Sequence, residues 1–177
     1  MQGSDNSVIS VDPLRFSALD EAKPGVLDAL LRDAYGQLLA TGEAVWQDES
    51  VRWAEFDREA FARPEVARCV FLSWCGAAVV GFGSFDPRET PRRGIVGHHC
   101  VRPAYRGRGF GDAQLREIIR RLRARGAERL AVNTLDLPFF APARRLYAHA
   151  GFEEVSRRPW SVAPDVVELE LELPTGH

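Results

Sequence analysis

The 177-residue chain has few cysteines and no long, purely apolar segment. Cys69, Cys75 and Cys100 are an odd number of cysteines inside segments of strand character, so we expect no disulfide framework and a reducing, cytoplasmic location. The longest uncharged apolar run, 69–85, is interrupted by glycine and serine, which is typical of two strands and a turn. It does not indicate a membrane span. The polar, acidic N-terminus shows no signal-peptide pattern.

Two common nucleotide-binding signatures are also missing. Gly107, Gly109 and Gly111 stand on alternate positions, so the Gly-x-Gly-x-x-Gly spacing of dinucleotide-binding loops does not occur here. The Gly-Lys-Ser/Thr of a Walker loop is absent as well, which argues against nucleoside triphosphates. No internal repeat or domain boundary is visible, and the length suits one domain.

The overall charge is close to balanced, although one segment is basic. Charged residues make up 27 % of the chain and the formal net charge is −2, which gives no general attraction to nucleic acid or to anionic membranes. Residues 88–129 contain twelve arginines against four acidic residues, a bias that could indicate nucleic acid. However, Asp112–Arg116 and Glu117–Arg121 are i,i+4 pairs of an exposed helix face. We therefore expect a small polyanion as the ligand, and no nucleic-acid or membrane partner.

The most informative stretch is residues 95–126. An apolar run of strand character ends before Pro103, three alternating glycines follow, and a helix then begins with Asp112 in its first turn. Free N–H groups at a glycine loop and a helix N-terminus bind phosphate, because the donors converge and the helix dipole favours an anion. Arg106 and Arg108 add positive charge to the loop. The pattern predicts a phosphate-binding loop, although an ordinary strand–turn–helix connection has the same local features.

Periodicity and turn signals predict the remaining elements. The strand 166–173 alternates apolar residues with glutamates, so we expect one of its faces in water. The unit formed by 94–101, 111–125 and 129–134 should place its two strands parallel. The expected helices cover 24–39, 51–62, 111–125 and 140–150, and the expected strands cover 8–11, 68–75, 77–85, 94–101, 129–134, 152–156 and 166–173.

Two motifs carry a resemblance to a known family. Residues 101–111, Val-Arg-Pro-Ala-Tyr-Arg-Gly-Arg-Gly-Phe-Gly, resemble the acetyl-CoA signature of the GNAT N-acetyltransferase superfamily, whose core Arg/Gln-x-x-Gly-x-Gly/Ala corresponds to Arg106, Gly109 and Gly111. Residues 143–152, Ala-Arg-Arg-Leu-Tyr-Ala-His-Ala-Gly-Phe, resemble the second signature of the family, Ala-x-x-Leu-Tyr-x-x-x-Gly-Phe. Two motifs in the expected order are more specific than either alone.

The resemblance implies a fold for nearly the whole chain. It predicts one α/β (α+β) domain over residues 8–173, with a central mixed, mostly antiparallel sheet of six to seven strands and about four flanking helices. Residues 1–7 are then a flexible start and residues 174–177 a tail. A homodimer is also expected by resemblance.

The resemblance further implies that acetyl-CoA is the co-substrate, that an amine attacks it directly in a ternary complex, and that no metal is needed. Tyr147 takes the position of the general acid, since a phenol can protonate the departing thiolate. The backbone N–H of His99 would face the thioester carbonyl, and the backbone of Val101 would bind the pantetheine arm. The loop and first helical turn would bind the pyrophosphate through Arg106, Gly107, Arg108, Gly109, Phe110, Gly111 and Asp112.

The general base stays open at this stage. Some family members carry a glutamate on the central strand where Ile95 stands here. His99 is one candidate, and strand parity places it toward the cleft and His98 away from it unless a bulge exchanges them. A loop carboxylate such as Glu43 or Asp86 acting through water is the alternative. A metal pair from the two histidines is not expected, because adjacent strand side chains diverge.

Other features leave alternatives. The family often has asparagine where Phe140 stands, and we expect Asn133 to supply a cofactor contact instead. Cys100 is read as a buried strand residue in preference to a nucleophile. Two alternative functions remain open at this stage. The chain could be a degenerate domain that binds CoA without catalysis, or it could bind nucleic acid. The acceptor cannot be read from the sequence: a small amine, an aminoglycoside, an amino acid and a protein amine all fit.

Overall fold

The computed structural model describes residues 12–174, whose strands form one seven-stranded sheet in the order β1-β2-β3-β4-β5-β7-β6. All neighbouring strands are antiparallel except β4 and β5, which are parallel. This confirms the mixed, mostly antiparallel sheet, while the strand predicted at 8–11 lies outside the described residues. The strands are β1 Leu14–Ser17, β2 Val70–Cys75, β3 Ala78–Asp86, β4 Arg93–Val101, β5 Arg129–Leu135, β6 Glu153–Trp160 and β7 Ala163–Leu173.

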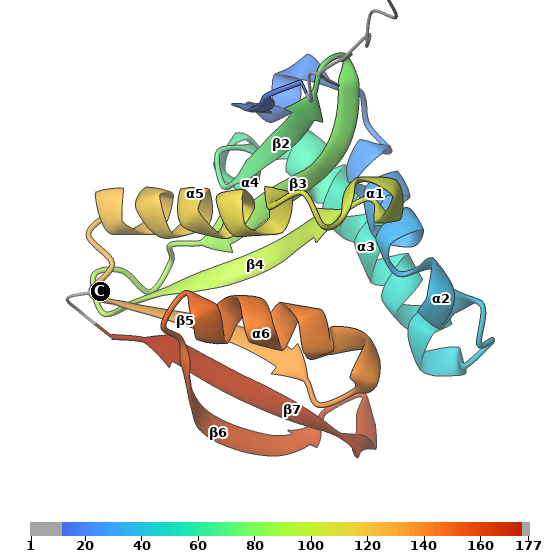
Figure 1. The fold of residues 1–177 in the computed structure, drawn as a ribbon, viewed down its shortest axis with the longest axis vertical. Helices are drawn as coiled ribbons and strands as arrows, with labels where there is room; N and C mark the ends of the chain where they lie inside the picture. Colours follow the sequence, from blue (N-terminus) through green and yellow to red (C-terminus); the bar gives the residue numbers. More distant parts are fainter. Residues whose placement is uncertain (1–11, 175–177) are drawn as a thin grey trace, which may run out of the picture.

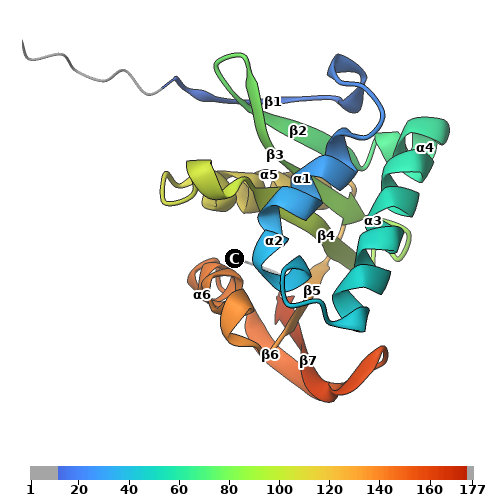
Figure 2. The same ribbon diagram turned by 90° about the vertical axis from the view of Figure 1, so that its right-hand side faces the viewer.

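Helices cover both faces of the sheet (Figures 1 and 2). α5 and α6 pack on one face around Phe71, Ile118 and Leu130, whereas α1 and α3 pack on the other around Leu30 and Phe82. Over residues 12–174 no helix combines the length and the apolarity that crossing a membrane requires. The helices are α1 Val26–Ala34, α2 Gly36–Leu39, α3 Ala44–Ala62, α4 Pro64–Ala67, α5 Phe110–Ala124 and α6 Ala141–His149.

Two predicted helix boundaries were wrong. The helix expected over 24–39 is interrupted at Tyr35, which separates α1 from α2. α3 begins at Ala44, seven residues before the expected start at 51. Its buried stripe includes two polar residues, Ser50 and Asp57, and because Ser50 interrupts the apolar pattern, hydrophobicity alone did not extend the helix back to Ala44.

Asp57 explains the buried polar position on α3. Its carboxylate accepts hydrogen bonds from the backbone N–H groups of Gly25 at 2.7 Å and Leu27 at 2.8 Å. These are donors at the N-terminus of α1, which have no partner inside that helix. The carboxylate therefore caps α1 from a different helix and fixes the orientation of the two helices against the sheet.

The glutamates of β7 are less exposed than the alternation predicted. Glu168 pairs with Arg158 at 2.7 Å, and Glu170 pairs with Arg93 at 2.6 Å, and both carboxylate side chains are less than one fifth exposed. Arginines from β4 and β6 cover this face of the strand. The charged face is therefore only partly exposed, because long arginine side chains from β4 and β6 cover it.

The feature that positions the site is the separation of β4 from β5. Their parallel register covers only Arg93↔Arg129, Gly94↔Leu130 and Ile95↔Ala131. Beyond Ile95, β4 stays paired with β3 on its other side through Val101. One backbone edge of the second half of β4 is consequently left without a neighbouring strand.

Candidate active site

The open edge of β4 presents backbone groups from alternate residues. The N–H of Arg102 donates to the carbonyl of Val80 in β3 at 2.8 Å. Because successive residues of a strand direct their N–H and C=O groups to opposite edges, those of Val101 and His99 face the gap toward β5. The Val101 carbonyl accepts a bond from Arg106 Nε at 3.1 Å, and the edge can pair with an extended amide-bearing ligand.

The glycine loop joins this edge to α5. Gly107 and Gly109 have φ angles of +76° and +78°, in the left-handed region that favours glycine. Gly109 is the N-cap of α5 and has no side-chain capping bond, so the first N–H groups of a 15-residue helix stay available. A Cβ on Gly109 would meet nothing within 4 Å. Loop and helix together leave several backbone N–H groups unpaired beside one another, a geometry that suits an anion.

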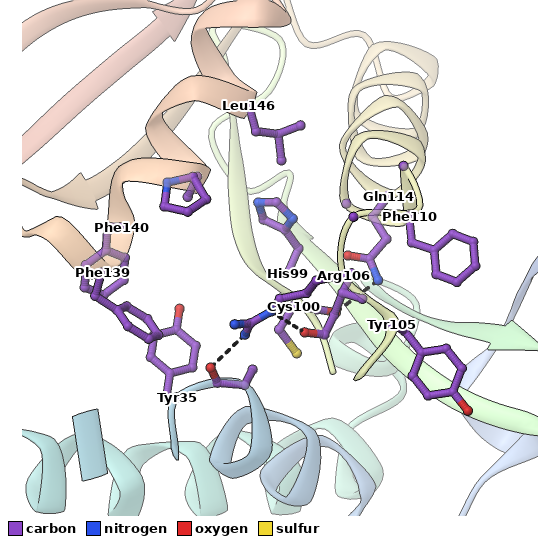
Figure 3. Close-up of a pocket in the computed structure, with 17 residues that line it drawn as sticks. Tyr35, His99, Cys100, Tyr105, Arg106, Phe110, Gln114, Phe139, Phe140 and Leu146 are labelled. Atoms are coloured by element: carbon purple, nitrogen blue, oxygen red, sulfur yellow. Dashed lines mark hydrogen bonds between the residues drawn. The ribbon is translucent and has the colours of Figure 1, made fainter. Parts of the chain in front are cut away.

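Two cavities lie along the gap. The first, of about 320 Å³, runs between α1, β4, the glycine loop and α6, and Figure 3 shows its lining, with His99 and Gln114 on one side and Phe139 and Phe140 on the other. The second, of about 290 Å³, extends toward α3 and the β6–β7 hairpin. The cavities share four lining residues, namely Tyr35, His99, Phe140 and Ala143.

His99 and Tyr147 form a bonded pair at this junction. His99 Nε2 and Tyr147 Oη share a hydrogen bond of 2.7 Å, and Tyr147 is only 5 % exposed. Burial raises the pKa of the Tyr147 phenol. Burial, reinforced by the neighbouring His98, lowers the pKa of His99 to about 4. At neutral pH the pair is thus a protonated phenol beside a neutral imidazole.

The predicted site residues divide between the two cavities. Tyr147 and Asn133 line the second cavity only, so Asn133 lies on the side away from the glycine loop. Arg108 and Asp112 line neither: Arg108 lies over the Tyr105 ring at 5.1 Å, and Asp112 pairs with Arg116. The first cavity contains His99, Val101, Arg106, Gly107, Gly109, Phe110 and Gly111.

Arg106 is held by the protein itself. Besides the Val101 carbonyl, its guanidinium donates to the carbonyl of Ala34 at 2.8 Å, drawn as a dashed line in Figure 3. Ala34 is the last residue of α1. Arg106 therefore ties the glycine loop to the end of α1, which orders Tyr35 beside the cavity.

The sequence reasoning missed a buried amide in the first cavity. Gln114 is fully buried, and its Nε2 donates to Ser73 Oγ at 2.9 Å and to the Cys100 carbonyl at 3.0 Å. Its Oε1 meets no donor in ordinary hydrogen-bond geometry, but the Gln114 side chain interacts with His99 and partly offsets the lowering of the His99 pKa by burial. The signal was available, because Gln114 lies four residues before Ile118 on the inward stripe of α5.

The carboxylates near the site are not those suggested as bases. Glu43 and Asp86 line neither cavity, and Asp86 pairs with Arg88 at 2.5 Å. Glu49 and Glu168 line the second cavity instead, and nothing in their local sequence distinguishes them from other surface glutamates. Among residues 12–174 no cluster of three or more His, Cys, Asp or Glu side chains is arranged to hold a metal ion.

Comparisons with known proteins agree with this geometry. The model of the acetyltransferase (GNAT) family matches residues 27–152. The uncharacterized N-acetyltransferase YsnE of Bacillus subtilis (strain 168) is 30 % identical over 95 residues, which are 54 % of this chain and 61 % of YsnE. The match therefore spans less than two thirds of that relative.

Solved structures show the same fold at low sequence identity. A protein described as of the GNAT family from Desulfovibrio desulfuricans has a TM-score of 0.71 and 18 % identity, covering 92 % of this chain and 98 % of its own. The structure of yncA from Salmonella typhimurium with its cofactor acetyl-CoA has a TM-score of 0.68 and 19 % identity, with coverage of 93 % and 95 %. Since the family model spans well over half of the sequence, the chain belongs to the GNAT family of acetyltransferases.

Proposed function

We propose that this protein transfers the acetyl group of acetyl-CoA to an amine by direct attack in a ternary complex. One observation carries the proposal: a cavity beside the glycine loop and a second, aromatic cavity meet at His99, next to Tyr147. A two-substrate transfer needs such a junction, because both reactants must reach one point from different sides.

The residues of the first cavity fit acetyl-CoA. The N–H groups of the glycine loop and of the α5 N-terminus would hold the pyrophosphate. The free edge of β4 at Val101 would pair with the amides of the pantetheine arm. Gln114 lines the same cavity and presents its amide oxygen beside His99. When bound, acetyl-CoA supplies an activated acyl group, and the related fold of yncA was solved with that cofactor.

The roles of the junction residues follow from their protonation. The backbone N–H of His99 faces the gap and would donate to the thioester oxygen as negative charge develops there. Tyr147, kept protonated by burial, would donate its proton to the departing sulfur. The neutral His99 imidazole orients the phenol through their shared hydrogen bond. In the tautomer that carries its hydrogen on Nε2, the imidazole would also donate to the phenolate and stabilise it. His99 is a weak base, so water in the second cavity would take both the proton that the ammonium loses before attack and the proton that the nitrogen loses as the amide forms.

A covalent route through Cys100 has less support. Cys100 lines the first cavity but is 7 % exposed. Burial raises the pKa of its thiol to about 12, so the nucleophilic thiolate is scarce at neutral pH.

Calorimetric titration with acetyl-CoA, with ATP and NAD as controls, tests the cofactor first. A release assay for free CoA over an amine library then tests the transfer, and initial rates at varied concentrations of both substrates should give intersecting lines. The Cys100→Ser variant should keep turnover. Absence of acetyl-CoA binding would refute the proposal, and parallel lines together with loss of activity in Cys100→Ser would replace direct attack by an acetyl-enzyme.

A further inference from the structure

The second cavity has an aromatic wall, made of Tyr35, Trp46, Trp53, Phe140 and Trp160. The Trp46 and Trp160 ring centroids are 5.7 Å apart, those of Trp46 and Phe140 6.2 Å, and those of Tyr35 and Trp53 5.1 Å. These rings come from the α1–α2 junction, from α3, from the turn before α6 and from the end of β6. The fold thus gathers distant aromatic residues around one cavity that opens onto His99 and Tyr147.

The charged side chains that line this cavity are two carboxylates, each paired with an arginine that lies outside it. Glu49 and Glu168 line it, each with a side chain that is 17 % exposed, and no arginine or lysine does. Their arginine partners, Arg52 and Arg158, do not line the cavity. A ligand carboxylate or phosphinate would be desolvated beside two carboxylates without a cation to pair with, which is unfavourable.

The volume also limits the occupant. About 290 Å³ is at the lower end of the range of roughly 300–1,000 Å³ for small-molecule sites. The space suits a compact amine better than a multi-ring amino sugar.

We infer that the acceptor is a small primary amine on an apolar or aromatic body that carries no acidic group. This inference rests on the proposed function and names the substrate class of the same site. The aromatic wall stabilises the apolar body by contact and an approaching ammonium by cation–π attraction. Glu49 and Glu168 favour the cation and reject acids. An aryl-alkyl amine should therefore bind, and its amino-acid analogue should not.

Binding can be measured without catalysis. Three of the four tryptophans, Trp46, Trp53 and Trp160, line this cavity, and only Trp74 lies elsewhere. Quenching of tryptophan fluorescence by phenethylamine and by phenylalanine compares two ligands that differ in one carboxylate. Butylamine and δ-aminovalerate form a second pair without a ring, whose members again differ in one carboxylate. We expect the acid-free member of each pair to bind and to be acetylated at least about tenfold better.

Matched variants test the role of charge. The double variant Glu49→Gln, Glu168→Gln removes both carboxylates and keeps the side-chain volumes, so the preference for the acid-free member should fall several-fold. Asp48→Asn with Glu153→Gln is the control, because both residues are exposed, line neither cavity and carry the same charge. The control should keep the wild-type preference.

The outcomes separate the two proposals. Equal or better binding and acetylation of phenylalanine and δ-aminovalerate would overturn the acceptor class and leave the transferase function standing. An unchanged preference in the glutamine double variant would overturn the role given to the two glutamates. If the acid-free amines quench fluorescence but no amine releases CoA, the transferase function fails while the binding preference holds.

Discussion

At the scale of single residues, the decisive pair is His99 and Tyr147. A tyrosine on the inward stripe of an amphipathic helix is ordinarily a core residue, and Tyr147 does pack against Phe152 with ring centroids 5.9 Å apart. What distinguishes it is the bond of its hydroxyl to His99 beside the cavity junction. The two roles can be separated by substitution, because a phenylalanine at position 147 keeps the ring packing against Phe152 and removes the hydroxyl that would donate the proton.

Tyr147→Phe should therefore reduce kcat at least about a hundredfold, the contribution typical of general acid catalysis. Acetyl-CoA affinity should stay within about twofold, because the hydroxyl does not line the first cavity. Steady-state kinetics and calorimetry on the same preparation measure the two quantities, and the thermal midpoint checks folding. Wild-type turnover in the folded variant would remove Tyr147 from the mechanism.

The low pKa of His99 makes a prediction about stability and pH. Its folded pKa of about 4 lies below the unperturbed 6.5, so the unfolded chain binds the proton more tightly between these values. The contribution of neutral His99 to the free energy of unfolding is therefore fully present above pH 6.5 and is lost as the pH falls toward 4. Over that window the unfolding free energy of wild type should fall by roughly 1–3 kcal/mol more than that of His99→Gln. Urea unfolding at several pH values measures this, and equal slopes would contradict a buried neutral His99.

At the scale of elements, the glycine loop and α5 act as a unit. Gly109 and Gly126 both have left-handed φ angles, +78° and +83°, and a Cβ on either would meet nothing within 4 Å. Gly109 begins α5 beside the first cavity, whereas Gly126 follows the other end of the helix. The two positions thus impose the same backbone strain with different access to the ligand.

Gly109→Val should lower acetyl-CoA affinity at least about tenfold, because its side chain enters the space beside the phosphate-binding N–H groups. Gly126→Val should leave the affinity unchanged, while both variants lose stability by about 1–2 kcal/mol from left-handed strain. Calorimetry and urea unfolding measure the two effects. Equal affinities in the two folded variants would show that phosphate binds elsewhere.

The elements differ in how well the sequence predicted them. The prediction was right to within a few residues for the β2–β3 hairpin, β4, α5 and α6. In these elements the apolar residues of the periodic pattern are the ones that are buried, and glycine or proline marks the ends. The first seven of the nineteen residues of α3 were missed, since the buried position nearest the predicted start is polar, Ser50. Asp57 is buried to cap α1, a contact 30 residues or more away in sequence that no local pattern contains.

At the scale of the whole molecule, the arginines that α5 contributes to the basic segment 88–129 contact other groups of the protein. On α5, Arg116 pairs with Asp112, and Arg120 and Arg121 pair with Glu117. Arg123 donates to three backbone carbonyls, and the guanidinium of Arg125 lies 4.7 Å from the Phe85 ring centroid. These arginines are thus engaged by groups of the protein itself.

We accordingly expect duplex oligonucleotides to bind no more tightly than the range of about 10⁻⁴–10⁻⁶ M typical of non-specific association. Fluorescence anisotropy at several salt concentrations measures it, with acetyl-CoA binding as the positive control. Sub-micromolar affinity with a steep salt dependence would contradict this and support the nucleic-acid alternative.

The sequence by itself determined the family, the sheet class and the glycine loop before α5. Each depends on residues adjacent in the chain: the glycines that permit left-handed turns, the helical period of α5, and two signatures in order. Only the tertiary structure decided which residues surround the acceptor. The aromatic wall, Glu49 and Glu168 come from segments more than 100 residues apart, and Gln114 and Asp57 are buried because of partners on other elements. Such contacts depend on how helices and strands pack, which local periodicity does not encode.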